Sequence, residues 1–312
     1  MTKTAKISVP KIMVVGSINY DVTTYVARFP RPGETVSARS YLAVCGGKGL
    51  NQAVAASRIG ADVSMVGCVG ADDFGGKALA HLAQNGVNTD GVTTCDTATG
   101  FASIMVEDGG ENVIAVAGGA NKVLAPTHVT AVRGAIEAAD ILIAQCEPGV
   151  AAIKTALEIA AKAGVPSVLN PAPAKDGIAP LLALASYITP NQSETKTLTG
   201  IYPQDKETRA QAFAAFKTLG VKTAIITCGA QGSFVSDENG ITHIPAFPAR
   251  AIDTTGAGDV FNGVFAAGLA RGQCAQDAAF TASAASALSV TKDTADSAPS
   301  AQDVAKILQE NR

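Results

Sequence analysis

The stretch Asp253-Thr254-Thr255-Gly256-Ala257-Gly258-Asp259 decides how this sequence is interpreted. The run after it, 260–269, is apolar on most faces and predicts a buried helix. Gly256 to Gly258 leave the amides at the helix start unobstructed, and these amides and the helix dipole favour an anion. Asp259 fits two roles: the N-cap of the helix, or a carboxylate facing a hydroxyl that attacks a phosphoryl group. The segment alone leaves both interpretations open.

Composition excludes several classes of partner. The formal net charge of -3 argues against nucleic acid. No apolar run reaches the roughly 18 residues of a membrane span, and the N-terminus shows no signal-peptide pattern. The six cysteines are scattered without a C-x-x-C pair, which favours reduced thiols. We therefore expect a cytoplasmic protein.

Strand-like and helix-like segments alternate along most of the chain. The first apolar run, 11–16, ends in glycine and is typical of a buried parallel strand. Two β-rich stretches, 22–44 and 100–116, interrupt the alternation, and a proline-punctuated run expected to be a strand, 244–252, precedes the opening stretch. The pattern predicts an α/β, doubly wound, mostly parallel sheet flanked by helices, with a small β-sheet lid. We assign 1–18, 47–98 and 120–312 to the core, and 19–46 and 99–119 to the lid.

Polar and glycine residues recur where expected strands end or the next helices begin. Asn19 and Asp21, two positions apart, face one side in extended backbone and suit neighbouring hydroxyls of a polyol. Asn191 and Glu194 have the spacing of a capping box, although Glu194 also suits magnesium-bound water. The full set is Asn19, Asp21, Gly46, Gly47, Lys48, Asn51, Glu147, Asn191, Glu194, Thr227, Gly229 and Gly232. All fall at one predicted sheet edge, where α/β proteins bind ligands. Neither a dinucleotide fingerprint nor a Walker P-loop is present.

Nearly the whole chain resembles the PfkB family of carbohydrate kinases. The stretches that carry the resemblance are 16–21, 32–36, 46–56, 170–174, 189–194 and 253–259. The resemblance implies ATP-dependent phosphorylation of the 5-hydroxyl of D-ribose, with Asp259 as general base and the amides of Gly256, Ala257, Gly258 and Asp259 as anion hole. It implies sugar binding by Asn19, Asp21, Gly46, Gly47, Lys48, Asn51, Glu147 and Asp259. It implies ATP binding by Asn191, Glu194, Thr227, Gly229, Gly232 and Gly258.

The same resemblance implies two cations and a second subunit. Glu194 would act through Mg²⁺, and K⁺ would lie at Asp253, Thr255, Ser289 and Ser297. The lid resembles those that pair two subunits, so we expect a homodimer that binds neither nucleic acid nor membrane.

Three departures from the family pattern bear on specificity. Tyr20 and Leu50 stand where smaller residues are common and flank the sugar motifs, so we expect them to influence sugar choice. Ala230 replaces a frequent serine in the nucleotide turn, and the loop 292–297 lacks the usual glycine. The alternatives are a kinase for another sugar, such as 2-deoxyribose, and a non-catalytic sugar- or nucleotide-binding regulator on the same fold.

Overall fold

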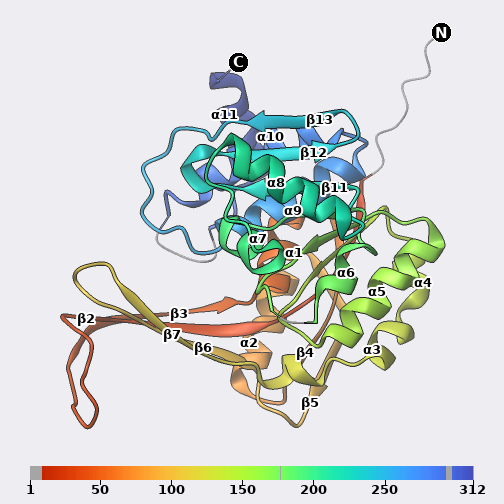
Figure 1. Cartoon of the computed structure of the whole chain (residues 1–312). Helices are drawn as coiled ribbons and strands as arrows, with labels where there is room; N and C mark the ends of the chain where they lie inside the picture. The colour runs from red at the N-terminus through yellow and green to blue at the C-terminus, as the bar shows by residue number, and fades with distance from the viewer. Residues whose placement is uncertain (1–8, 176, 293–296, 312) are drawn as a thin grey trace.

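The computed structural model describes residues 9–175, 177–292 and 297–311, and Figure 1 shows their arrangement. A nine-stranded sheet runs through this part of the chain. In spatial order its strands are β13 (Gly240–Ile244), β12 (Ser233–Asp237), β11 (Thr223–Thr227), β10 (Tyr187–Ile188), β9 (Ser167–Asn170), β8 (Ile141–Gln145), β1 (Lys11–Val15), β4 (Asp62–Gly70) and β5 (Val87–Cys95). Neighbours from β5 to β11 pair parallel, whereas β12 and β13 are antiparallel.

Helices cover both faces of this sheet. One apolar cluster joins it to α1 (Lys48–Arg58), α2 (Asp73–Gln84), α9 (Ala257–Ala270), α10 (Ala275–Ser289) and α11 (Ala301–Glu310). The other joins it to α3 (Pro126–Ala131), α4 (Arg133–Glu137), α5 (Val150–Ala163), α6 (Ala179–Leu182) and α8 (Lys206–Thr218). Along β1, Ile12 and Val14 lie in the first cluster, Met13 and Val15 in the second. A strand buried on both faces needs apolar residues throughout, and the predicted doubly wound class is confirmed.

A second sheet, which we call the lid, extends away from the body (Figure 1). Its strands, in order, are β3 (Ala38–Gly46), β2 (Asn19–Val26), β6 (Gly100–Val106) and β7 (Asn112–Ala117). Asn19 pairs with Gly46 on one side and with Gly100 on the other. Two distant stretches of sequence therefore form one sheet, as predicted.

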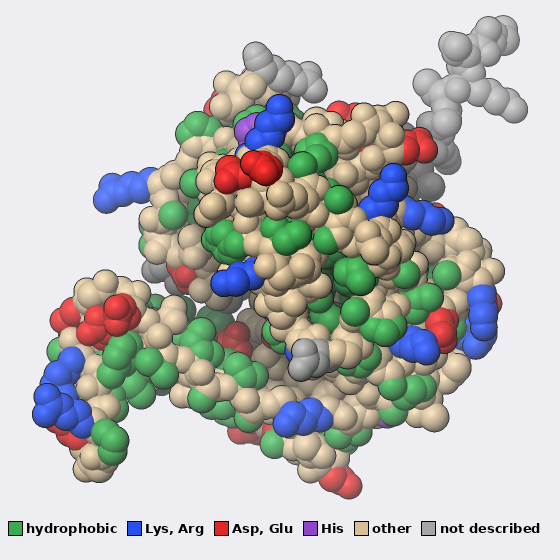
Figure 2. All heavy atoms as spheres, viewed as in Figure 1, with side chains coloured by type: hydrophobic (Ala, Val, Ile, Leu, Met, Phe, Trp, Pro, Cys, Tyr) green, Lys and Arg blue, Asp and Glu red, His purple; other side chains and the backbone are tan. Residues whose placement is uncertain are grey.

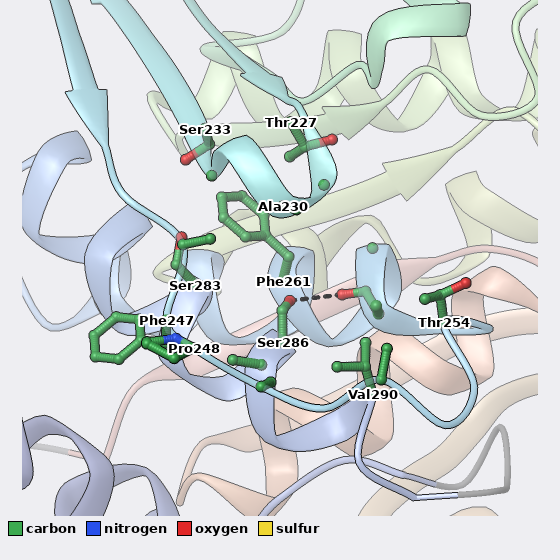
Figure 3. A pocket seen from close by; sticks show the side chains of 18 residues that line it. Thr227, Ala230, Ser233, Phe247, Pro248, Thr254, Phe261, Ser283, Ser286 and Val290 are labelled. Atoms are coloured by element: carbon green, nitrogen blue, oxygen red, sulfur yellow. Dashed lines mark hydrogen bonds between the residues drawn. The ribbon is translucent and has the colours of Figure 1, made fainter.

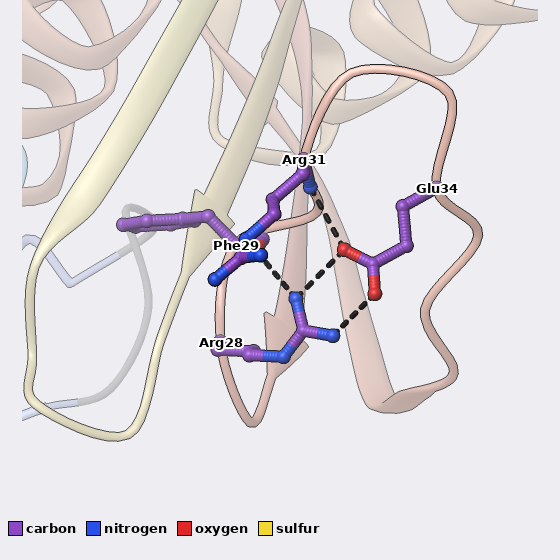
Figure 4. A network of polar contacts seen from close by, with 4 residues as sticks. All are labelled: Arg28, Phe29, Arg31 and Glu34. Carbon is purple, nitrogen blue, oxygen red and sulfur yellow. Dashed lines mark hydrogen bonds and ion pairs between the residues drawn. The ribbon is translucent and has the colours of Figure 1, made fainter.

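The loop at the far end of the lid is organised by Glu34 (Figure 4). Its Oε2 accepts hydrogen bonds from Arg28 Nη1 at 2.8 Å and Arg31 N at 2.9 Å. The hydrogen bond from Arg28, followed by that from Arg31 N, lowers the pKa of Glu34 to about 2. Gly33 completes the turn with a φ of 80°. The stretch 32–36 is therefore a turn at the lid tip.

One expected element differs from the structure. The expected strand 244–252 ends at Ile244, where β13 stops. Pro245 and Pro248 have no N–H to donate to a ladder, so this segment is irregular. The helical segment before β8 is divided into α3 and α4 at Val132. No helix among the described residues is long and apolar enough to cross a membrane.

Candidate active site

The site begins at the N-terminus of α9. Gly256 is the N-cap residue, with a left-handed φ of 77°, and the helix begins at Ala257. A Cβ at Gly258 would meet no atom within 4 Å beyond the adjacent residues and backbone of its own helix, so the first turn is open on that side. The helix is buried from Asp259 to Gly268. An open, amide-rich end on a rigid helix is a site for an anion.

Asp259 is inside the helix, so the alternative that it serves as the N-cap is wrong. Asp259 is buried, at 7% exposure, and its side chain lies against the N-terminal half of α1. Asn51 Nδ2 donates to its Oδ2 at 3.2 Å, and Gln52 Nε2 donates to its Oδ1 at 2.9 Å. Neighbouring amides of one helix therefore hold both carboxylate oxygens of Asp259.

Polar groups from β2 and from the strand ends surround the same point. Glu147 accepts hydrogen bonds from the Ser17 hydroxyl and, at 3.2 Å, from Lys48 N. Asn19 Oδ1 accepts from Asn121 Nδ2 at 2.7 Å. These bonds fix Glu147 and Asn19 before any ligand arrives.

Asp21 has a buried oxygen, Oδ1, with no hydrogen-bond partner among the described residues. A Cβ on Gly46 would lie 2.1 Å from its Oδ2, so any larger residue there would displace the Asp21 carboxyl group. Burial, followed by the charges of Glu147 and Asp259, raises the pKa of Asp21 to about 7, while Lys48 opposes the rise. An unpaired buried carboxylate oxygen is costly and suits a ligand hydroxyl.

Lys48 is the cation among these acids. Asp259 contributes most to the rise in the pKa of Lys48, burial opposes it, and Glu147, Glu194 and Asp21 add to it. The positive charge of Lys48 is therefore held beside the N-terminus of α9. Figure 2 shows a hollow between the projecting lid and the body of the molecule.

A cavity of about 600 Å³ opens on the other side of the first turn of α9 (Figure 3). Thr227, Gly229, Gly232 and Gly258, which the resemblance assigns to ATP, line it. The remaining lining is mostly apolar or small: Ala230, Ser233, Ala246, Phe247, Pro248, Ala249, Ala251, Thr254, Ala257, Phe261, Ser283, Ser286, Ala287 and Val290. The irregular segment after β13 thus forms a wall of this cavity.

Asn191 and Glu194 lie beside this cavity, at the start of α7 (Gln192–Thr199). Asn191 Oδ1 accepts from Glu194 N, and Glu194 Oε2 accepts from Asn191 N, both at 2.8 Å. The predicted capping box is therefore present. Asn191 also pairs with Thr227 in a β-bridge, which joins it to the cavity wall. Burial raises the pKa of Glu194, while the bond from Asn191 N lowers it.

Three of the candidate K⁺ residues, Asp253, Thr255 and Ser289, lie where the loop before α9 meets the end of α10. Asp253 N donates to Val290 O at 3.3 Å, and Asp253 Oδ1 accepts from Thr255 N at 2.8 Å. Ser289 is buried and donates to Ser286 O at 2.8 Å. Ser297 Oγ is buried without a partner in the described chain, and 293–296 lie outside the described residues. No cluster of three His, Cys, Asp or Glu residues suited to a metal occurs within 9–175, 177–292 and 297–311.

The structure corrects the expectation that Tyr20 and Leu50 lie beside the sugar. Tyr20 stacks on Phe74 of α2, with ring centroids 4.4 Å apart, and Phe74 stacks on Phe101 of β6 at 5.9 Å. Leu50 is 1% exposed within the apolar cluster under α1. Side chains alternate along β2, so Tyr20 faces away from Asn19 and Asp21. Neither residue lines the sugar side, whereas Ala230 does line the nucleotide cavity.

Sequence reasoning also missed residues that hold the site together. Ser17, Gln52 and Asn121 are each buried and each hydrogen-bonded to a predicted site residue. Ser17 and Gln52 lie inside motifs already recognised, so their positions carried a signal. Asn121 follows two glycines after β7, at the same sheet edge, which is a weaker signal.

A buried carboxylate at a helix terminus suited to an anion, between a hollow with polar residues and a separate cavity, is the arrangement expected of a phosphotransferase. The family model for pfkB family carbohydrate kinases matches residues 9–301. The chain belongs to that family, whose members are kinases acting on a sugar hydroxyl.

Three relatives illustrate the similarity. The ribokinase of Haemophilus influenzae is 41% identical over 259 residues, covering 83% of this chain and 85% of that one. A bifunctional ribokinase/ribose-5-phosphate isomerase A of Fructilactobacillus sanfranciscensis is 44% identical over 261 residues, which are 83% of this chain and 48% of that longer protein. The structure of Arabidopsis thaliana ribokinase complexed with ribose and ATP superposes with a TM-score of 0.91 at 31% identity, covering 97% of this chain and 99% of that one.

Proposed function

We propose that this protein transfers the γ-phosphoryl group of ATP to the 5-hydroxyl of D-ribose. The observation that carries the proposal is the position of Asp259. Its carboxylate shares a hydrogen bond with Asn51 on the polar side, while Gly258, one residue earlier, lines the cavity. One turn of α9 thus presents a proton acceptor to the sugar and free amides to the phosphate.

The chemistry follows from these groups. As the sugar oxygen forms its bond to phosphorus and the bond between phosphorus and the leaving ADP oxygen breaks, Asp259 takes the hydroxyl proton. The amides of 256–259 and the charge of Lys48 stabilise the negative charge on the transferring group. The products are ribose 5-phosphate and ADP. Closure of the lid over the sugar would exclude water and prevent hydrolysis of ATP.

The sugar would bind to groups that are already oriented. Asn19 and Glu147 are fixed by Asn121 and by Ser17, respectively. Asp21 offers a buried oxygen that has no protein partner among the described residues. Because a site built to hydrogen-bond hydroxyls rejects analogues that lack them, these residues favour a polyhydroxylated sugar over a deoxy sugar.

Two cations are part of the proposal. Mg²⁺ would be held through water by Glu194, whose carboxylate lies beside the cavity wall, and would neutralise charge on the ATP phosphates. K⁺ would lie among Asp253, Thr255, Ser289 and Ser297. The buried Ser297 Oγ, which has no hydrogen-bond partner among the described residues, supports this oxygen-rich set as a place for a hard cation.

We also propose a homodimer formed through the lid, residues 19–46 and 99–119. All six residues of β7 are exposed, among them Val113, Ile114 and Val116, and Tyr41 of β3 is 74% exposed. Figure 2 shows hydrophobic side chains gathered along the lid. An apolar edge strand left in water is a liability that a second subunit would remove. Light scattering tests the dimer and should give twice the mass of the 31.4 kDa chain. The variant Ile114→Lys should lower the measured mass to that of the monomer.

The experiment that tests the proposed reaction is a coupled ADP assay with ribose, 2-deoxyribose, fructose or no sugar, each with and without K⁺. We expect ribose to give the highest kcat/KM and K⁺ to raise the rate. Preference for 2-deoxyribose would assign another sugar. Absence of turnover with every sugar, while ATP and ribose still bind by calorimetry, would favour the non-catalytic regulator.

A further inference from the structure

A chain of buried amides ends on Oδ1 of Asp259. Gln52, with no exposed surface, donates from Nε2 to Asp259 Oδ1 at 2.9 Å and to Asn170 Oδ1 at 3.2 Å. Its Oε1 accepts from Gln145 Nε2 at 2.8 Å. Gln145 and Asn170 are register partners at the ends of β8 and β9. The amides therefore form a compact, buried group between α1, α9 and the central sheet, and neither Gln52 nor Gln145 has any exposed surface.

The direction of these hydrogen bonds is set by a backbone group. Asn170 Nδ2 donates to Thr189 O at 3.3 Å, and a carbonyl only accepts. Asn170 therefore directs its Oδ1 towards Gln52. Because Oδ1 only accepts, Gln52 must donate to it from its amino group. That amino group carries a second hydrogen, which reaches Asp259. A reversed Gln52 would point an oxygen at the oxygens of both Asn170 and Asp259.

The two oxygens of Asp259 are therefore not equivalent. Oδ1 is bound by a side chain that has no exposed surface, whereas Oδ2 is bound by Asn51, which is partly exposed and belongs to the candidate sugar set. The charged groups around the carboxylate are Lys48, Asp21 and Glu194. Gln52 leaves Oδ2 as the oxygen directed at the sugar side.

The arrangement carries a cost that packing alone does not explain. Gln145 Oε1 is buried without a partner in the described part of the chain, and a Cβ on Gly16 would lie 2.0 Å from it. An unsatisfied buried oxygen destabilises a fold, and apolar side chains of similar shape would avoid that cost. Costly buried polar groups of this kind are expected where a sequence serves function.

We propose that Gln52 is a positioning residue for phosphoryl transfer. It fixes Oδ1 of Asp259, so that Oδ2 alone accepts the proton of the sugar hydroxyl. The inference rests on the proposed function and adds the assignment of roles to the two oxygens.

The test compares Gln52→Met with wild type in steady-state kinetics and sugar calorimetry. Because small displacements of a catalytic group can cost up to about 100-fold, we expect kcat to fall by about 10- to 100-fold. The KM values for sugar and ATP and the Kd for sugar should be unchanged, since Gln52 touches neither substrate. Gln52→Glu, which keeps the size but sets a second carboxyl group against Oδ1, should lose at least as much kcat.

Three further variants separate positioning from stability. Ser167→Ala removes a buried acceptor of the Ser186 amide at the opposite end of β9 and should lower the melting temperature without changing kcat. The double variant Gln52→Met/Gln145→Met removes both amides, including the Gln145 oxygen that has no partner among the described residues. Its melting temperature should therefore be closer to that of wild type than the melting temperature of Gln52→Met is. Its kcat should stay as low as that of Gln52→Met. Asn51→Ala, in contrast, should raise the sugar KM.

The outcomes are distinct. A folded Gln52→Met protein with wild-type kcat overturns the assignment. So does a rise in its sugar KM equal to that of Asn51→Ala, or a recovery of kcat together with stability in the double variant. A wild-type chain with no sugar kinase activity overturns the proposed function, and the role of Gln52 with it.

Discussion

The two sides of the α9 N-terminus are built differently. On the sugar side, side-chain hydrogen bonds hold Asn19, Glu147 and Asp259 in place. On the nucleotide side, the cavity is lined by small or apolar residues such as Gly229, Ala230 and Phe261. In the proposed reaction, the first side would recognise its ligand by fixed polar groups and the second by shape and backbone groups. Substitutions should therefore act on the sugar side by removing groups and on the nucleotide side by filling space.

The largest effect is expected where the two sides meet. Asp259→Ala removes the proton acceptor while leaving the helix, so kcat should fall by about 10²–10⁴-fold, the usual contribution of a general base. Circular dichroism should show a folded protein, and calorimetry should show that ATP still binds. A well-folded variant with near-wild-type kcat would exclude Asp259 as the base.

A large effect confined to the sugar side is expected from Asp21→Asn. Hydrogen bonds to a charged partner contribute more than neutral ones, so the sugar KM should rise by about 10- to 100-fold while the KM for ATP stays constant. An equal rise in the KM for sugar and the KM for ATP would contradict the assignment of Asp21 to the sugar side alone.

The same carboxyl group predicts a pH dependence. Its pKa is raised from 3.8 to about 7, so ionisation of Asp21 destabilises the empty protein. The stability that this group contributes is fully present below its unfolded pKa and is lost as pH rises through about 7. Asp21→Asn should therefore raise the melting temperature at pH 8, and the gain should disappear towards pH 4. A gain that is equal at both pH values would exclude ionisation of Asp21 as the cause.

A matched pair of glycines sharpens the comparison. In Gly46→Ala the new Cβ would lie 2.1 Å from Asp21 Oδ2, so both sugar affinity and stability should fall. In Gly258→Ala it meets no atom within 4 Å, so the helix should gain up to about 1 kcal/mol. The extra methyl group would occupy the space proposed for the phosphate and would displace the reacting phosphoryl group. Because such displacement slows the reaction, kcat/KM for ATP should fall by about tenfold. Melting curves and ATP kinetics check both variants, and unchanged ATP kinetics in Gly258→Ala would exclude phosphate binding there.

The smallest effect is expected from Ala230→Ser. Ala230 lines the cavity, and a serine there would offer one neutral hydrogen bond. Such a bond contributes roughly 0.5–1.5 kcal/mol, so the KM for ATP should fall by about two- to tenfold with the sugar KM unchanged. A rise in the KM for ATP would mean that the hydroxyl is buried without a partner.

The sequence predicts the architecture and the strand-end motifs because both follow from local patterns. A few consecutive residues are enough to recognise the glycines before Asp259, the spacing of Asn19 and Asp21, and the apolar strands. The hydrogen bond from Gln52 to Asp259 spans 207 positions and that from Asn121 to Asn19 spans 102, and no local pattern encodes either. Tyr20 was misassigned although the alternation along β2 already placed it opposite Asn19 and Asp21.

The pairing of β2 with β6 has an evolutionary consequence. Asn19 and Asp21 lie on β2, so two of the side chains proposed to bind the sugar belong to the lid rather than to the body of the protein. The apolar edge strand β7 belongs to that same sheet. A lid exchanged between relatives would carry its sugar contacts and its exposed edge together. Substrate choice and subunit pairing would then be inherited as one trait, while the nucleotide cavity, built entirely outside the lid, would be free to diverge separately.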